Sequence, residues 1–547
     1  MIEALHRRPL LAIFLLATLM ALAFQGSRGL WDPDEGRYSN VALQMLKSGD
    51  PVTLYRHPAS FHFTKPPLTY WAMAASVKTF GRNEWAVRLP MALAFVLSAL
   101  LVFRLGRLFV PERPWLPALI FVASPYPFLA AYTVNTDTVL AATEILAVLC
   151  YAQARFDGGS PRWLDAMWAA FGLAFLTKGP PGLLPLLAVL AFHLSHRGSG
   201  VKLLRPIGLL AFALIGFTWY ALVIERHPGL LQYFLGHEVV ARIASEEMDR
   251  NPQWYGPLIV YLPVLVLGLL PWLPLAVIRS VEWRFYSALL AYARKLPVYP
   301  LPVLLAYLVA AIPILMDLFL HIFRKIRSAP RAWSAASSDA RFLWLWLALP
   351  LLVFCLARSR LPLYVLPLAA PLSLLVARAL TDWRPGRGWA IAIGGWVLLL
   401  IGFKGALALT LSGDSELARG LRRNNAANVS AQLRPLLPGP PREIVFVEDK
   451  TRYGLNLYLD ADIARVGFKP EPKKISDARF DMSLAQSFAQ KHGGRIYLVP
   501  RPHREHFLAA AREAGVAATE LGVMADERGR ADKDRVVYTL RGDFPPR

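Results

Sequence analysis

The chain has 547 residues, of which 55% are hydrophobic, and its mean hydropathy is +0.38. This composition excludes an ordinary soluble protein, which must cover its surface with polar groups. The formal net charge of +22 could indicate nucleic-acid binding, but the basic residues lie in short connections between apolar runs and form no single patch. A multi-pass membrane protein accounts for both properties, because basic residues gather in the cytoplasmic loops of such proteins.

Apolar runs long enough to cross a bilayer, about 17–25 residues each, recur along the chain. The first follows Arg7 and Arg8 and has no small-residue cleavage site after it. We therefore expect a retained span with a cytoplasmic N-terminus and not a signal peptide. The runs cover residues 9–24, 86–110, 115–134, 137–156, 163–178, 179–197, 204–225, 256–279, 341–358, 361–381 and 388–411.

Basic residues determine the orientation of these spans. If residues 31–85 lie outside, the basic connections near residues 104–113, 155–162, 196–205, 279–295 and 378–387 all fall inside. A further run at 298–322 breaks the alternation, because basic residues both precede and follow it. We predict a hairpin or re-entrant segment there, broken by Pro297, Pro300, Pro302 and Pro313.

Three segments outside the bilayer have patterns of their own. In the first loop, 31–85, Asp32 suits a helix cap, Pro33 a first helical position and Gly49 a helix end, which predicts an amphipathic helix along the membrane surface. A second large loop covers 226–255. Residues 412–547 carry dense mixed charge, with β-like runs at 443–447, 496–499 and 535–540 and a helix-like stretch at 503–515. They predict a small α/β domain on the outer side.

Polar side chains gather at the outer ends of the predicted spans. Lys and Arg bind phosphate oxygens through charge-assisted hydrogen bonds, and a carboxylate can orient or deprotonate an acceptor. Ionisable groups at membrane depth are costly, so they count as site candidates. The set is Asp34, Glu35, Arg37, Lys65, Asn135, Asp137, Lys178, His237, Arg242, Arg360 and Tyr364. It suits a reaction on an anionic lipid.

Each of these residues also has a simpler explanation. The acids of the first loop could complement the dipole of a helix, with Arg37 as an ordinary intrahelical partner. Asp137 could cap a helix, the lysines and Arg360 could be interfacial side chains, and His237 could be a packed histidine. Only the joint pattern indicates a site.

The joint pattern resembles a known family. The motifs DPDEGRY (32–38), FTKPPLTYW (63–71), NTD (135–137), LTKGPPGLLP (176–185), HEVVAR (237–242) and SRLPLYVLP (359–367) occur in the order and on the side seen in the GT-C membrane glycosyltransferases. The chain looks most like the lipid A aminoarabinose transferase branch, a relative of the protein O-mannosyltransferases. The resemblance implies an all-α polytopic membrane domain over 1–411, with about 11–13 transmembrane helices, followed by the small α/β domain over 412–547.

The resemblance also implies roles for the matching residues. Asp34 would be the acid at the reacting centre, with Glu35 as its neighbour and Asp137 as the second acidic position. Arg37, Lys65, Arg242 and Tyr364 would contact the lipid phosphate, and Lys178 and Arg360 are further binding candidates. The family commonly has Glu before the lysine of the KP motif, in a position linked to metal binding, whereas this chain has Thr64. We therefore expect no cofactor, with His237 only a weak metal candidate.

The implied function is an inverting transfer of a sugar, 4-amino-4-deoxy-L-arabinose, from undecaprenyl phosphate to lipid A phosphate, in the bacterial inner membrane with the site facing the periplasm. Neither a Walker A sequence nor a GxGxxG fingerprint is present, which fits a lipid-borne donor. A hydroxyl acceptor would need Asp34 as a base, whereas an ionised phosphate would not. Two alternatives remain: a related transferase, for example of mannose to protein, and a flippase, which would need polar groups across the whole bilayer.

Overall fold

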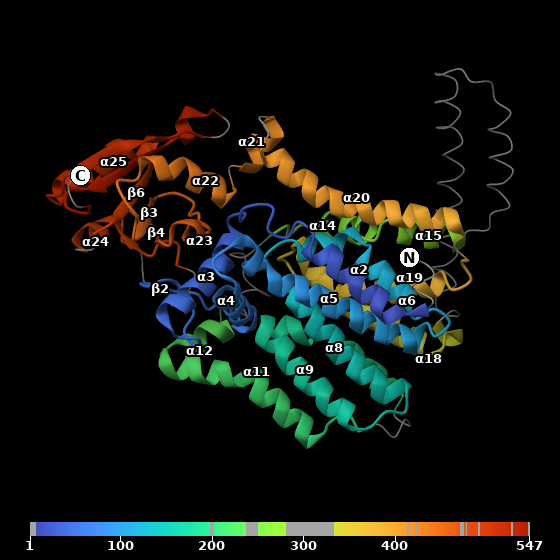
Figure 1. The fold of residues 1–547 in the computed structure, drawn as a ribbon. Helices are drawn as coiled ribbons and strands as arrows, with labels where there is room; N and C mark the ends of the chain where they lie inside the picture. The colour runs from blue at the N-terminus through green and yellow to red at the C-terminus, as the bar shows by residue number, and fades with distance from the viewer. Residues whose placement is uncertain are drawn as a thin grey trace, which may run out of the picture.

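Helices form an elongated bundle, and a sheet domain covers one end of it (Figure 1). The computed structural model describes residues 7–196, 202–236, 250–280, 333–384, 386–412, 415–422, 424–470, 475–476, 478–490, 493–526 and 529–544. The hairpin predicted at 298–322 and the predictions for His237 and Arg242 lie outside these residues.

Six described helical segments are long and apolar enough to cross a membrane. They are α5 (Glu84–Phe109), α8 (Asp137–Phe156), α11 (Pro206–Arg226), α18 (Ser338–Leu356), η5 with α19 (Pro362–Leu368 and Ala369–Ala379) and α20 (Arg387–Ser412). Further helices of the bundle are α2 (Pro9–Leu22), α9 (Arg162–Lys178), η1 (Pro180–Leu183) and α10 (Leu184–Ser195). These bounds agree closely with the predicted runs, which confirms the polytopic helical fold class.

Two runs that we predicted as single spans are interrupted. The run 115–134 forms α6 (Trp115–Val122) and α7 (Pro125–Ala131), and the run 256–279 forms α14 (Gly256–Leu267) and α15 (Trp272–Ser280). In each case a proline, Pro125 or Pro271, lies at or just before the start of the second helix. Proline has no amide hydrogen and disfavours a helical conformation in the preceding residue. A count of apolar residues cannot detect these breaks.

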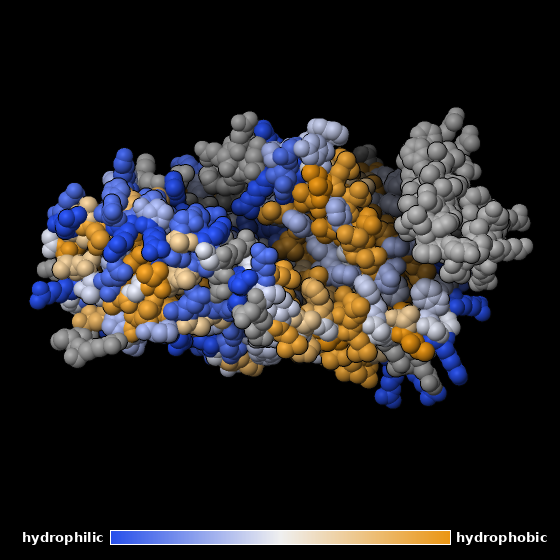
Figure 2. All heavy atoms as spheres, turned by 90° about the horizontal axis from the view of Figure 1, so that it is seen from above, coloured by the Kyte–Doolittle hydropathy of each residue, from blue (hydrophilic) through white to orange (hydrophobic). Residues whose placement is uncertain are grey.

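The surface of the bundle is apolar around its middle. In Figure 2 orange side chains predominate on the bundle, whereas the sheet domain shows mostly blue side chains with orange ones among them, and blue side chains appear again at the opposite end. Helix α20 contributes to the apolar band, with Ile391 and Leu409 each 75% exposed. An apolar band between two polar ends is the surface expected of a membrane-embedded protein.

The first loop lies between the bundle and the sheet domain (Figure 1). It contains α3 (Asp34–Ser48), β1 (Tyr55–His57), β2 (Ser60–Phe61) and α4 (Leu68–Phe80), and β1 and β2 pair antiparallel. Gly49 ends α3 with φ 70°, as predicted. Asp32 does not cap α3, because Pro33 occupies the N-cap position without a side-chain hydrogen bond. Other parts of the chain cover α3 on both faces, since its polar residues Asn40 and Gln44 are buried as well as its apolar ones.

The sheet domain has six strands in the order β5-β4-β3-β6-β8-β7. Strands β5, β4, β3 and β6 are parallel to their neighbours, whereas β8 is antiparallel to both β6 and β7. The strands are β3 (Glu443–Val447), β4 (Asp462–Gly467), β5 (Met482–Ser483), β6 (Arg495–Pro500), β7 (Ala518–Met524) and β8 (Arg535–Leu540). The three predicted strands are β3, β6 and β8; β4, β5 and β7 were missed.

Short helices connect these strands and join the domain to α20. They are α21 (Glu416–Arg422), α22 (Ala426–Leu433), η6 (Arg434–Leu436), α23 (Leu455–Leu459), α24 (Leu484–Ala489), η7 (Arg501–His503), α25 (Arg504–Glu513) and η8 (Ala531–Lys533). Helix α25 is the helix predicted at 503–515. On the other side of the first loop, α12 (Leu230–Gln232) follows α11.

Buried polar contacts fasten the sheet domain to the first loop. The Arg56 guanidinium pairs with Asp481 at 2.7 Å, and both side chains are almost fully buried. The Asn456 amide donates to the Asn40 side-chain oxygen at 2.7 Å. The carboxylate of Asp32 accepts the Gly454 amide hydrogen at 3.2 Å. Burial raises the pKa of Asp32 to about 7, against the opposing effects of Arg452 and the Gly454 hydrogen bond.

We predict that replacement of Asp32 by Asn removes a pH dependence of stability. The folded pKa of Asp32 lies above its unfolded value, so its contribution to stability is fully present below about pH 4 and is lost as the pH rises through about 7. Asn keeps the hydrogen-bond acceptor without an ionisation. Thermal unfolding of the purified chain should therefore show Asp32→Asn to be more stable than the parent at pH 8 by on the order of 2–4 kcal/mol, with a smaller difference at pH 5. The exposed Asp532→Asn is the control; equal pH profiles for parent and Asp32→Asn would contradict the prediction.

Candidate functional site

The first turn of α3 presents an exposed ion pair. The Arg37 guanidinium contacts the Asp34 carboxylate at 2.6 Å, and the two side chains are 28% and 64% exposed. The pair has the i, i+3 spacing of an ordinary helical pair. Asp34 is nevertheless accessible to a reactant, as the assignment of a reacting acid requires.

Glu35, the next residue, has a different environment. Its carboxylate accepts hydrogen bonds from Arg28 at 2.5 and 3.1 Å and from Arg88 at 3.1 Å, and also from the backbone amides of Trp31 and Val134 at 2.8 and 2.9 Å. Burial alone would raise the pKa of Glu35, but the two guanidiniums hold it at about 2. These donors occupy both oxygens. The environment does not support the catalytic assignment of Glu35 and makes it a fixed anion that fastens α3 to the bundle.

Three of the predicted site residues meet at one end of the bundle. Asp137 begins α8, Lys178 ends α9, and Tyr364 lies in η5. The Lys178 ammonium forms an ion pair with Asp137, and both side chains are more than nine-tenths buried. The same ammonium lies 4.5 Å from the centre of the Tyr364 ring, a cation–π contact. Three segments that are distant in the sequence, α8, α9 and η5, therefore bring these side chains to the same end of the bundle.

Glu144 is a buried acid that the sequence analysis missed. It lies seven residues after Asp137 on α8, so the two share a helix face. Its residue is 2% exposed, and it lies within electrostatic range of Lys178 and Asp137. The i, i+7 spacing from Asp137 was the available signal. The Lys178 ammonium thus faces two carboxyl groups.

Tyr38 and His62 are buried residues of the first loop that lie near several of the charged candidates. Burial raises the pKa of Tyr38 to about 12, and the residue lies within range of Arg37, Asp34 and Asp137. The Arg37 guanidinium lies 5.3 Å from the Tyr38 ring centre. Burial also lowers the pKa of His62 well below its usual range, and the charges of Arg37, Arg56 and Lys65 act in the same direction. Tyr38 therefore lies near the charges of the Asp34–Arg37 pair and of Asp137, and His62 lies near those of Arg37 and Lys65.

The position linked to metal binding in the resembling family has neutral groups here. The Thr64 hydroxyl lies 3.1 Å from His62 Nε2, which also lies 3.0 Å from the Tyr70 hydroxyl. Lys65, whose ammonium donates to the Thr64 carbonyl at 2.9 Å, adds positive charge nearby. A hydroxyl next to cations is a poor ligand set for a divalent ion. Within the part of the chain that the structure describes, no three His, Cys, Asp or Glu side chains form a group that could hold a metal ion.

Arg360, one of the predicted binding residues, braces two neighbouring segments. Its guanidinium donates to the backbone carbonyls of Asn251 at 2.7 Å, Gln253 at 2.9 Å and Cys355 at 2.9 Å. The residue is 5% exposed. These contacts connect the segment before α14 to the end of α18, while the buried Nε of Arg360 has no hydrogen-bond partner. His237 and Arg242 are not among the residues that the structure describes.

The fold and the site define a class: a polytopic membrane protein with acids and cations gathered at one end of its spans. Residues 64–224 match the family model described as dolichyl-phosphate-mannose-protein mannosyltransferase. The crystal structure of ArnT from Cupriavidus metallidurans bound to undecaprenyl phosphate aligns over 98% of both chains with a TM-score of 0.65 and 20% sequence identity. The chain therefore has the fold of that GT-C protein.

Sequence relatives point to the same group. The chain is similar to the undecaprenyl phosphate-alpha-4-amino-4-deoxy-L-arabinose arabinosyl transferase of Pseudomonas savastanoi, with 31% identity over 409 residues, 73% of this chain and 66% of the relative. It is similar to arabinosyl transferase 2 of Pseudomonas fluorescens, with 29% identity over 402 residues, 72% of this chain and 63% of the relative. The matches span less than two thirds of these relatives. The predicted resemblance to ArnT-like transferases is confirmed.

We predict that the Asp137–Lys178 pair behaves as one buried unit. Lys178→Met would leave a buried carboxylate without its cation, which destabilises a protein by about 3–5 kcal/mol. The double variant Asp137→Asn with Lys178→Met should recover much of that loss, because no unpaired charge remains. Thermal unfolding of the purified variants measures the coupling.

The partly exposed pair of Asp165 and Arg205, 2.9 Å apart at the opposite end of the bundle with side chains 15% and 28% exposed, is the matched control. Arg205→Met should destabilise the protein much less, by about 1 kcal/mol or less. A loss in the double variant equal to the sum of the losses in Asp137→Asn and Lys178→Met would show that the pair is not coupled.

Proposed function

We propose that the chain is an inverting glycosyltransferase that moves 4-amino-4-deoxy-L-arabinose from undecaprenyl phosphate to lipid A. The observation that supports the proposal is the contact of Lys178 with Asp137 and the Tyr364 ring at one end of the bundle, together with the exposed Asp34–Arg37 pair on α3. The names of the sequence relatives and the ArnT fold support the same donor. The proposal also makes the protein a component of a bacterial inner membrane.

The reaction exchanges one bond at the anomeric carbon. The acceptor oxygen forms a bond to that carbon, and the bond from the carbon to the phosphate oxygen breaks with its electron pair passing to undecaprenyl phosphate. Negative charge grows on the leaving phosphate, and cations fixed nearby stabilise it. Arg37 and Lys65 supply this charge in our proposal, with the Tyr364 hydroxyl as a further donor. Arg242, outside the described residues, keeps the same assignment from its motif.

Asp34 and Asp137 have separate roles. Asp137 is paired with Lys178, so it holds that ammonium in place below the Tyr364 ring. Asp34 is accessible and adjoins Arg37, so it orients the donor, whose amino group is a natural partner for a carboxylate. An ionised lipid A phosphate needs no base, whereas a hydroxyl acceptor would transfer its proton to Asp34. Glu35 and Arg360 act as positioning residues.

The second candidate is a related transferase that moves a hexose to protein. The observation that favours it is the mannosyltransferase family match over residues 64–224. Mass spectrometry of lipid A and of envelope proteins, from cells with and without the gene, separates the two. A pentosamine on lipid A supports the first proposal, a hexose on protein supports the second, and neither product contradicts both.

We predict that Asp34→Asn abolishes most of the transfer. Loss of the carboxylate should lower the rate by about 100-fold or more, because it either orients the donor or accepts a proton. The rate is measured with purified chain and lipid-linked donor. Asp460→Asn is the matched control, since Asp460 is also an exposed acid, 75% exposed, paired with an arginine, Arg82, at 2.7 Å. Full activity of Asp34→Asn would remove Asp34 from the mechanism.

We also predict that the site faces the periplasm. The connections at the far end of the bundle carry Arg104, Arg107, Arg155 and Arg378, as the positive-inside rule requires of a cytoplasmic face. In a chain whose own Cys150 and Cys355 are replaced by Ala, a single cysteine introduced by Lys78→Cys, on the exposed side of α4, should react with an impermeant maleimide in spheroplasts. Arg107→Cys, at the far end of α5, should react only after the membrane is opened. The reverse pattern would overturn the orientation.

A further inference from the structure

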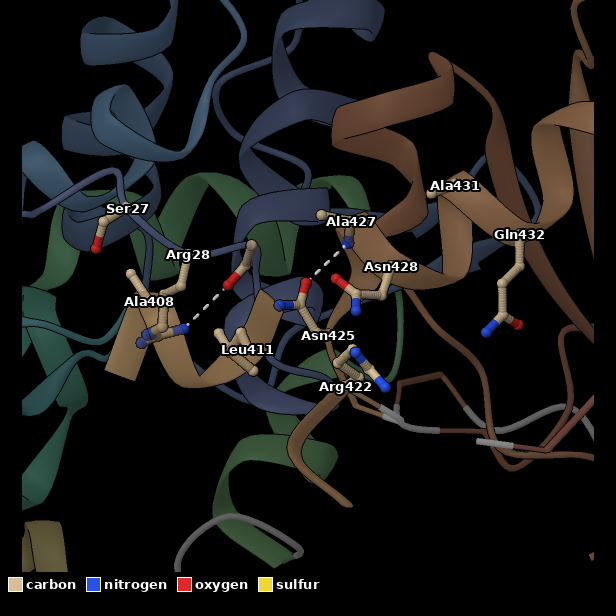
Figure 3. A pocket seen from close by; sticks show the side chains of 11 residues that line it. Ser27, Arg28, Ala408, Leu411, Arg422, Asn425, Ala427, Asn428, Ala431 and Gln432 are labelled. Carbon is tan, nitrogen blue, oxygen red and sulfur yellow. Dashed lines mark hydrogen bonds between the residues drawn. The ribbon is translucent and has the colours of Figure 1, made fainter. Parts of the chain in front are cut away.

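A pocket of about 590 Å³ lies between the bundle and the sheet domain, apart from the site above. Three segments form its walls: residues 27–29 before α3, the last turns of α20, and the region of α21 and α22. Figure 3 shows Arg28 with Ala408 and Leu411 on one side and Asn425, Asn428 and Arg422 on the other. Its volume is within the range of small-molecule sites.

Close packing of the backbone fixes the wall that joins residues 27–29 to α22. A Cβ on Gly29 would lie 2.0 Å from the Asn425 side-chain oxygen, so only glycine fits there. The Asn425 oxygen caps α22 by accepting the Ala427 amide hydrogen at 3.0 Å, as Figure 3 shows. The Ala426 amide donates to the Leu30 carbonyl at 2.8 Å. The pocket is therefore a built feature of the junction.

Positive charge dominates the pocket and the region behind it. Among the described residues that line it, Arg28 and Arg422 are charged and none is acidic. Arg28 and Arg88 share the single carboxylate of Glu35. Lys404 lies behind them and donates to the carbonyls of Met20 and Ala21 and to the Gln25 side chain. The two buried guanidiniums of Arg28 and Arg88 thus share one carboxylate, and this excess of positive charge attracts a further anion.

Two polar groups of the lining have hydrogen-bonding capacity to spare. Nε of Arg28, in a side chain with 0% exposure, has no hydrogen-bond partner. The Asn428 amide forms no hydrogen bond with any described residue, and its two N–H groups are donors. Guanidinium and amide donors suit phosphate oxygens. Ala408 and Leu411 add an apolar flank to this donor set.

The position of the pocket identifies the source of the phosphate. Ala408 and Leu411 lie in the last turns of α20, where that span leaves the apolar band. Leu409, between them in sequence, is 75% exposed, so acyl chains reach this level of the helix. Lipid phosphates lie where the apolar band ends.

We propose that this pocket binds the phosphate-bearing headgroup of an anionic lipid in the leaflet on the sheet-domain side. The proposal does not depend on the transferase function. Arg28 links the pocket to Glu35, one residue from Asp34, so an occupant lies next to the element that positions the reacting acid.

Native mass spectrometry of the purified full chain, titrated with dioleoyl phosphatidylglycerol or with dioleoyl phosphatidylcholine, tests the proposal. Arg28 is left intact because it holds Glu35. The double variant Arg422→Gln with Asn428→Leu should weaken phosphatidylglycerol binding by about tenfold or more, the effect of one lost charge-assisted hydrogen bond. Ala431→Trp, which fills the pocket and keeps its charge, should have a similar effect. Arg419→Gln removes an exposed charge from α21 outside the lining and is the control.

Competition with inorganic phosphate separates the two sources of the anion. Displacement of the lipid would assign the recognition to the phosphate group itself, whereas resistance to displacement would assign it to the whole lipid; both support the pocket as a phosphate site. Binding that is unchanged in both pocket variants, or equal binding of phosphatidylcholine and phosphatidylglycerol, would overturn the proposal. Activity does not enter these measurements, so they are independent of any failure of the transferase proposal.

Discussion

The carboxylate of Glu35 is the interaction on which the arrangement of the first loop depends. It joins α3 to residue 28, to α5 through Arg88 and to the turn before α8 through the Val134 amide. A single anion among two buried guanidiniums is strongly held, because removal of it would leave two charges without compensation. The exposed charges of the next turn of α3 take their position from this buried contact.

Most of the bundle could be predicted from the sequence, because a membrane span has to be long and apolar. The runs at 86–110 and 388–411 became α5 and α20 almost residue for residue. Hydropathy did not predict the helix breaks, because backbone geometry determines where a helix ends, as at Pro125. The sheet was predicted only in part: β3 is a continuous apolar run, whereas β4, with sequence DIARVG, has its apolar residues between charges.

The sequence predicted on which face of the membrane the site residues lie, but it did not predict which side chains contact one another. Orientation alone placed Asp137, Lys178 and Tyr364 at one face, and the structure brings them together. Orientation could not distinguish Asp34 from Glu35, since neighbours on a helix point about 100° apart and the partners of Glu35 lie in other segments. Arg88 is one such partner, and its place within an apolar run gave no sign of it. Arg360 likewise has partners that only the folded chain brings near.

The attachment of the sheet domain to the first loop has a consequence for biosynthesis. Residues 31–85 are among the first to be translated. The buried partners of Arg56 and Asn40 are Asp481 and Asn456, which are translated more than 400 positions later. A ribosome that has produced every span has therefore still not produced the partners of these buried groups. Such an order leaves the first loop without its buried contacts until the last domain has been translated.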